Sequence, residues 1–206
     1  MSETLAVGLV LALALVLAPR SARADEPAAS TTTSAAEDVG EQAIGAELGV
    51  ASGGRVTPGG LRIAGHYLYQ LSDEDWFDGG ASFTFGSGGA ACFRDRMNTY
   101  LCDHGITDGS GVEISATVRR YFTAQGDFRP FARAGIGIGI VRFPDDGVTG
   151  LAIPVHLGGG VRASVADAIA VTAQAELEVG FGVFGKGLGL EPQLGLAIVA
   201  GAEFRL

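Results

Sequence analysis

Hydrophobic residues alternate with polar or small residues along most of the chain from about residue 43 to the C-terminus. This period of two is typical of β-strands with two unlike faces. The alternating segments cover residues 44–50, 61–71, 77–85, 112–122, 133–140, 151–162, 169–181 and 193–206. A strand of about 10 residues crosses a hydrocarbon core when it is tilted. The pattern predicts an all-β fold of eight strands without a helix.

The apolar face could point into a soluble, lipocalin-like barrel or outward into lipid. The interior of an eight-stranded barrel is only just filled by its side chains, and five or six Leu, Ile, Val or Phe side chains per strand would overfill it. The opposite face carries mostly Gly, Ala, Ser and Thr with scattered charges, which fits a narrow lumen. The sequence therefore predicts an eight-stranded antiparallel transmembrane up-and-down barrel with its apolar face against lipid.

The connections between the segments are alternately short and long, as in transmembrane barrels with short periplasmic turns and longer outer loops. The short connections are 72–75, 123–127 and 164–167, and the longest, 86–111, is expected on the outer side. Aromatic residues are expected in a belt at each membrane interface. The periplasmic belt would contain Tyr69, Phe77, Phe122, Phe128 and Phe204, and the outer belt Phe85, Phe143 and Phe181.

The N-terminus has the pattern of an export signal. An apolar run of 14 residues, Leu5 to Ala18, precedes the small-x-small sequence Ala22-Arg23-Ala24. We expect residues 1–24 to be a cleaved signal peptide, 25–42 a flexible segment rich in Ala, Ser and Thr, and 43–206 the barrel.

The composition and net charge limit the kinds of partner that the protein can bind. The chain has 206 residues and a net charge of -9, with 14 Lys and Arg against 23 Asp and Glu, which argues against a nucleic-acid partner. The two cysteines, Cys92 and Cys102, lie in the long outer loop of an exported chain, so we expect them to form a disulfide. This bridge would shape the loop as a compact lobe.

Charged side chains on the lumen face must pair, because an isolated charge in a narrow barrel is very costly. The predicted lumen network consists of Arg62, Arg119, Arg133, Arg162, Glu113, Glu176 and Glu178. The same face carries Arg129, Arg205, Glu47, Glu203, His66 and His156. No catalytic, cofactor or metal site is expected. The lipid A deacylase family carries a Ser two residues from its His on one strand, whereas Leu68 and Gly158 occupy those positions here.

The strand pattern, the export signal and the closing segment GLAIVAGAEFRL resemble eight-stranded Gram-negative outer-membrane β-barrels of the OmpA/OmpX type. The resemblance covers residues 43–206 and implies a monomer surrounded by outer-membrane lipid and inserted by the barrel-insertion machinery through that C-terminal segment. The resemblance alone does not select a function, because this fold hosts adhesins, structural anchors, small channels and lipid-modifying enzymes. We expect a structural or surface-interaction role through the outer loops, toward a partner the sequence does not specify. A small-solute, porin-like channel is the alternative function, and a lipid-modifying enzyme is a distant third hypothesis.

Overall fold

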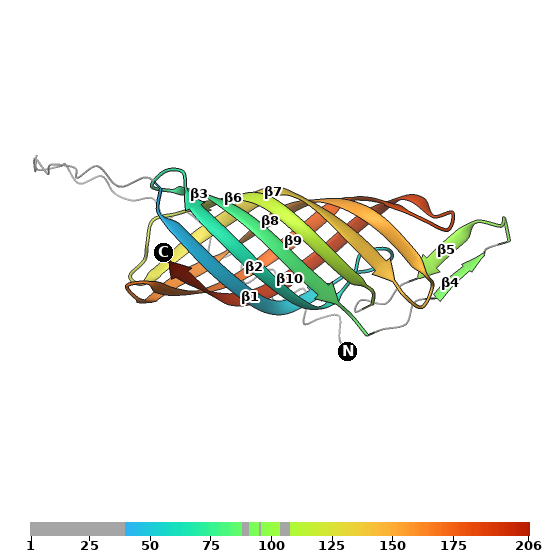
Figure 1. The fold of residues 1–206 in the computed structure, drawn as a ribbon, viewed down its shortest axis with the longest axis horizontal. Coiled ribbons are helices and arrows are strands. Elements are labelled where there is room, and N and C mark those ends of the chain that lie inside the picture. The colour runs from blue at the N-terminus through green and yellow to red at the C-terminus, as the bar shows by residue number, and fades with distance from the viewer. Residues whose placement is uncertain (1–39, 88–90, 95, 104–107) are drawn as a thin grey trace, which may run out of the picture. The chain divides into compact units, whose positions relative to one another are not determined.

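The computed structural model describes residues 40–87, 91–94, 96–103 and 108–206, and for 91–94 and 100–103 it describes the backbone alone. The barrel strands are β1 Gln42–Ser52, β2 Gly60–Gln70, β3 Asp75–Phe85, β6 Ser110–Tyr121, β7 Phe128–Phe143, β8 Val148–Ala166, β9 Ile169–Phe184 and β10 Gly189–Arg205 (Figure 1). Within this part of the chain, no helix is long and apolar enough to cross a membrane. The predicted signal peptide and most of the segment 25–42 lie outside the described residues.

The eight strands close into a barrel in the order β1-β10-β9-β8-β7-β6-β3-β2. All neighbouring strands are antiparallel, and β1 closes the ring against β10, where Ala43 is opposite Arg205 and Ser52 is opposite Leu196. The predicted fold class is therefore confirmed. The long connection after β3 contains a two-stranded hairpin, β4 Ala91–Arg94 and β5 Tyr100–Asp103, which is separate from the barrel wall.

The two faces of the wall differ as the alternation predicts. Outward-facing apolar residues are largely uncovered by protein, for example Leu48 at 55%, Ile136 at 61% and Leu194 at 64% exposed. Their inward neighbours Glu47 and Gln193 are buried. An apolar outer surface of this extent is stable in lipid, where burial of hydrocarbon groups replaces their contact with water.

The lumen is narrow enough to require glycine at several inward positions. A Cβ atom on Gly135 would lie 2.3 Å from the backbone oxygen of Ala116, and one on Gly137 would lie 2.7 Å from Nε2 of His156. The space above these glycines is therefore already filled by the neighbouring strand and by lumen side chains.

The rim of the barrel at the end with the longest connection is uneven. The strands β1, β2 and β3 have 11 residues each, whereas β7 to β10 have 16 to 19. Because β1 ends opposite Leu196, residues 189–195 of β10 extend past it. The β1–β2 loop fills this step: Gln193 Nε2 donates to the Val56 carbonyl at 3.0 Å, and the Leu194 N–H donates to Thr57 Oγ1 at 3.1 Å.

One aromatic residue differs from the predicted belts. Phe143 was expected near lipid, but its side chain points into the barrel and is 1% exposed. It has the same parity along β7 as the inward residues Arg133 and Val141, so the alternation itself places it in the lumen. The other predicted belt residues, including Phe77, Phe85 and Phe181, are exposed on the outer surface.

Because the apolar face points outward, a charged residue introduced on that face should destabilise the barrel more near the middle of the membrane than near its surface. Leu157, in the middle of β8 opposite Leu177 of β9, is 49% exposed. Leu157→Arg is expected to lower the free energy of unfolding by about 2 to 4 kcal/mol, because the guanidinium would lie in hydrocarbon. Leu190→Arg, in the part of β10 beyond β1, is the control and should cost about 1 kcal/mol or less. Equal costs in urea unfolding from lipid vesicles would contradict the outward assignment.

Candidate functional site

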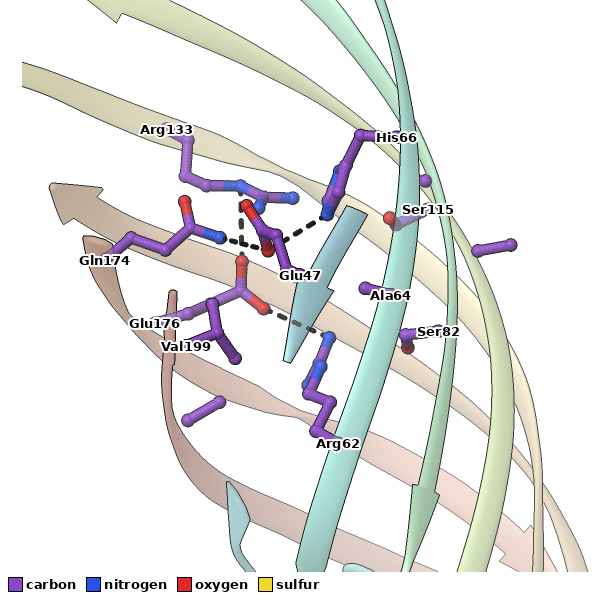
Figure 2. A pocket seen from close by; sticks show the side chains of 13 residues that line it. Glu47, Arg62, Ala64, His66, Ser82, Ser115, Arg133, Gln174, Glu176 and Val199 are labelled. Carbon is purple, nitrogen blue, oxygen red and sulfur yellow. Dashed lines mark hydrogen bonds and ion pairs between the residues drawn. The ribbon is translucent and has the colours of Figure 1, made fainter. Parts of the chain in front are cut away.

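The middle of the lumen contains an ion-pair network centred on Glu176 of β9. Arg62 of β2 reaches across the lumen and forms ion pairs with Glu178 and, at 3.3 Å from NH2 to Oε1, with Glu176. Arg133 of β7 approaches the other oxygen of Glu176, with Nε 3.2 Å from Oε2. Figure 2 shows the two guanidinium groups on either side of this carboxylate. One buried carboxylate therefore links strands that are not neighbours in the wall.

His156 of β8 extends this network toward β6. Its Nδ1 lies 3.1 Å from Oε1 of Glu176, and its Nε2 lies 2.9 Å from Oε1 of Glu113. The side chain is fully buried. Glu113 thus joins the network through the imidazole.

A second histidine forms a similar bridge closer to the end of the barrel that carries the short turns. His66 of β2 has Nδ1 at 2.8 Å from Oδ1 of Asp78 and Nε2 at 3.0 Å from Oε2 of Glu47. Gln174 donates from Nε2 to the same Glu47 oxygen at 2.9 Å (Figure 2). Arg133 lies on the other side of Asp78, with NH2 3.8 Å from Oδ2, and so connects the two clusters.

Arg119 of β6 is the most deeply buried arginine of the lumen, at 0% exposed. Its NH2 donates to Oδ2 of Asp78 at 2.8 Å, and its NH1 forms an ion pair with Glu203. The guanidinium also stacks over the Phe131 ring, 4.5 Å from the centroid. Arg162 binds the second oxygen of Glu203, with Nε 2.9 Å from Oε2.

The charges of this network balance only when both histidines are protonated. Its members are the arginines Arg62, Arg119, Arg133 and Arg162 and the carboxylates Glu47, Asp78, Glu113, Glu176, Glu178 and Glu203. Each imidazole has a carboxylate oxygen close to both of its ring nitrogens. The Nδ1 contacts are hydrogen bonds, and the Nε2 contacts are ion pairs only when the ring carries its second proton. Six cations then face six anions.

Apolar layers lie on both sides of the network. At the end with the longest connection, Val56 of the β1–β2 loop packs with Val141, Phe143, Val148, Ala152 and Phe184. The end with the short turns has a second cluster, in which the Tyr121 and Phe131 ring centroids are 5.6 Å apart. Its members are Ala43, Leu68, Trp76, Tyr121 and Phe131. Between these layers, the network side chains leave a cavity of about 10 Å³, the space of one water molecule. Ion-paired side chains therefore fill the middle of the described lumen, between the two apolar clusters.

The structure brings together more residues than the predicted network contained. Arg62, Arg133, Glu176, Glu178 and Glu113 meet through shared contacts. Arg119 and Arg162 meet at Glu203 instead. Glu47, Asp78 and the two histidines complete the pairing, and their inward parity is the signal that marks them. Arg205 was also expected inside but is 43% exposed and pairs with Glu41 at the rim.

One part of the network has the residue types of a metal site. Ligand atoms of His156, Glu176 and Glu178 lie within 4.8 Å of one another. Arg62 forms ion pairs with both of these carboxylates, so a metal cation would meet a permanent positive charge there. The geometry favours an ion-pair role for these three residues over metal binding.

The predicted disulfide falls on residues described by backbone alone. In the β4–β5 hairpin, Cys92 is directly opposite Cys102. Directly opposite residues of antiparallel strands have Cα atoms about 4.5 to 5.5 Å apart, which suits a disulfide. The bridge itself stays a prediction.

Comparison with known proteins agrees with this architecture. No protein-family model and no curated protein matches the sequence. Neisserial surface protein A is similar in structure, with a TM-score of 0.54 and 13% identity over 80% of this chain and 97% of that one. The N-terminal barrel domain of Pseudomonas aeruginosa OprF has a TM-score of 0.47 and 15% identity over 81% of this chain and 99% of its own. Yersinia pestis Ail has a TM-score of 0.45 and 16% identity over 81% of this chain and 99% of its own.

The similarity to the neisserial protein shows a shared fold. The closed barrel of eight antiparallel strands, together with an apolar outer wall around a charged lumen, defines an outer-membrane β-barrel. The outer membrane is accordingly the location of this chain.

Removing one partner of the buried network is expected to be costly. Glu176→Ala would leave Arg62, Arg133 and His156 without their shared anion and should lower the free energy of unfolding by about 3 to 5 kcal/mol. Asp75→Ala removes the partner of Arg120 in an ion pair whose arginine is 58% exposed, and should cost less than about 1 kcal/mol. Denaturant titrations of both variants compare the costs. Equal losses would show that the lumen network is hydrated.

Proposed function

We propose that this protein is a closed outer-membrane anchor that presents its outer connections, above all residues 86–109, at the cell surface. The filling of the lumen by paired charges is the observation that carries the proposal. A barrel that conducts solutes needs a hydrated path, whereas here ion pairs fill the middle of the lumen and apolar clusters cover both ends. The remaining surface for interaction is the outer side, where the longest connection leaves the barrel.

The β4–β5 hairpin suits a surface-interaction role. It forms a separate two-stranded sheet within the longest connection, and its tip residues Met97 and Asn98 are exposed. A disulfide between Cys92 and Cys102 would hold the hairpin together in the oxidising space outside the cell. In this proposal the barrel is a monomer that is inserted through its C-terminal segment, and the hairpin contacts an extracellular partner.

The alternative functions have less support from the lumen. A channel would need the charges of Arg62 and Glu176 to face water rather than each other. A hydrolase of the kind considered above would need a histidine free to accept a proton from a serine. Both ring nitrogens of His66 and of His156 instead face carboxylates.

Surface labelling tests the proposed presentation of the outer connections. Met97→Cys, in the hairpin tip, is expected to react in intact cells with a membrane-impermeant maleimide, since Met97 is 85% exposed. Asp127→Cys, in the β6–β7 turn, is the control and should react only after the outer membrane is permeabilised. The unsubstituted protein should not react if Cys92 and Cys102 are oxidised. Labelling of the Asp127 variant alone in intact cells would contradict the proposed orientation.

A further inference from the structure

The apolar outer wall of the barrel has two heights. On β1, β2, β3 and β6, four or five consecutive outward positions are apolar or glycine, within 44–50, 61–69, 77–85 and 112–118. On β8, β9 and β10, eight consecutive outward positions are apolar or glycine, within 151–165, 169–183 and 190–204. We call the outer face of the first four strands the short side and that of the last three strands the tall side.

Each height occupies one continuous side of the barrel. In the ring of strands, β6, β3, β2 and β1 are neighbours, and so are β8, β9 and β10. The ends of the tall side also agree with one another. Val183 of β9 is opposite Leu151 of β8 and Leu190 of β10. At the other end, Ile169 of β9 is opposite Phe204 of β10. The tall side is therefore one coherent surface.

Polar side chains mark where the apolar wall ends. On the short side, the outward residues beyond it are Gln42 and Ser52 on β1 and Ser110 and Arg120 on β6. The Arg120 side chain is 58% exposed. On the tall side, Thr149 of β8 is the next outward residue beyond Leu151. Because polar and interfacial residues flank the apolar band of a membrane barrel, these positions mark the membrane borders on each side.

The two heights differ by more than one turn of polar residues could hide. A strand tilted by about 40° rises about 2.5 Å along the barrel axis for each residue. The short side is therefore about 25 Å tall from Gln42 to Ser52, which matches the apolar band of outer-membrane barrels. The tall side is about 35 Å from Ile169 to Val183.

Tilting the barrel does not remove this difference. A tilt moves both borders of one side in the same direction, so it cannot match a side that is taller than the other. Exposure of the additional surface to water is unfavourable, since Val183 and Leu190 are 61% and 67% exposed and belong to one apolar patch. A bilayer changes its local thickness at a modest cost for each ångström of mismatch.

We propose that the protein deforms the membrane around it, so that the hydrocarbon region is thicker beside the tall side than beside the short side. Lipid acyl chains cover the additional apolar surface. The surface continues the lipid-facing wall with the same alternation, and no polar outward residue interrupts it between Ile169 and Val183. A protein partner would instead be expected to bring polar contacts to the rim of its interface.

Spin labels at the four borders test the proposal. Phe77→Cys and Phe85→Cys place a label at the two borders of the short side on β3, and Ile169→Cys and Val183→Cys do so on the tall side. Leu177→Cys, in the middle of β9, is the control for a deep position. Each variant is made in a chain with Cys92 and Cys102 replaced by serine, and is refolded into vesicles of dimyristoyl phosphatidylcholine. Heat-modifiable migration in detergent gels confirms that it is folded.

The depth of each label follows from its collision rate with oxygen divided by that with a water-soluble nickel chelate. Polar solutes are excluded from hydrocarbon, so this ratio should agree within about twofold for Phe85 and Val183, and likewise for Phe77 and Ile169. The Leu177 label should give the highest ratio. This result would show a hydrocarbon region that follows the height of each side.

Three results would overturn the proposal. Higher access of the chelate at both Val183 and Ile169 than at Phe85 and Phe77 would show a bilayer of uniform thickness. Higher access at only one of the two would show a tilted barrel in such a bilayer. Protection of Val183 from both oxygen and the chelate would show that protein, such as a second copy of the chain, covers the tall side.

Discussion

The structure depends on the pairing of charges inside a space too narrow for bulk water. Arg62, Arg119 and Arg133 lie almost completely buried, and each reaches carboxylates on distant strands. An uncompensated charge at such a position costs several kcal/mol, which is a large fraction of the total free energy of unfolding of an ordinary domain. The network therefore constrains the barrel as a whole, because a shift of any one strand separates charges that the others require.

The other features of the lumen follow from this constraint. Glycines such as Gly137 leave room for His156 and Glu113, since a Cβ atom there would collide with both side chains. The apolar clusters at the two ends keep water away from the ion pairs in the middle of the lumen, which strengthens these pairs. Val56 is part of one of these clusters, and the β1–β2 loop that carries it is hydrogen-bonded to the part of β10 that extends past β1. The uneven rim therefore helps to position the cluster.

Much of this architecture could be predicted from the sequence. Alternation is enough to assign most side chains of the wall to lipid or lumen, and the same rule applied to Phe143 would have placed it correctly. It fails at the strand end, where Arg205 turns to the rim and pairs with Glu41. The partners within the lumen could not be predicted in this way. Arg62 and Glu176 are distant in sequence and on opposite sides of the barrel, so their contact depends on the registers of all the intervening strands. The inward position of Val56 likewise depends on tertiary packing, because the β1–β2 loop has no periodic pattern.

The central claim is that the lumen is closed by paired charges between apolar layers. Single-channel recording of the refolded, unsubstituted barrel in planar lipid bilayers tests it most directly. We predict no stable conductance steps above the background of protein-free bilayers over a wide range of voltages, because neither end of the lumen admits a hydrated ion. Large, long-lived and ion-selective currents would contradict the sealed lumen and would make a channel the better description of this protein.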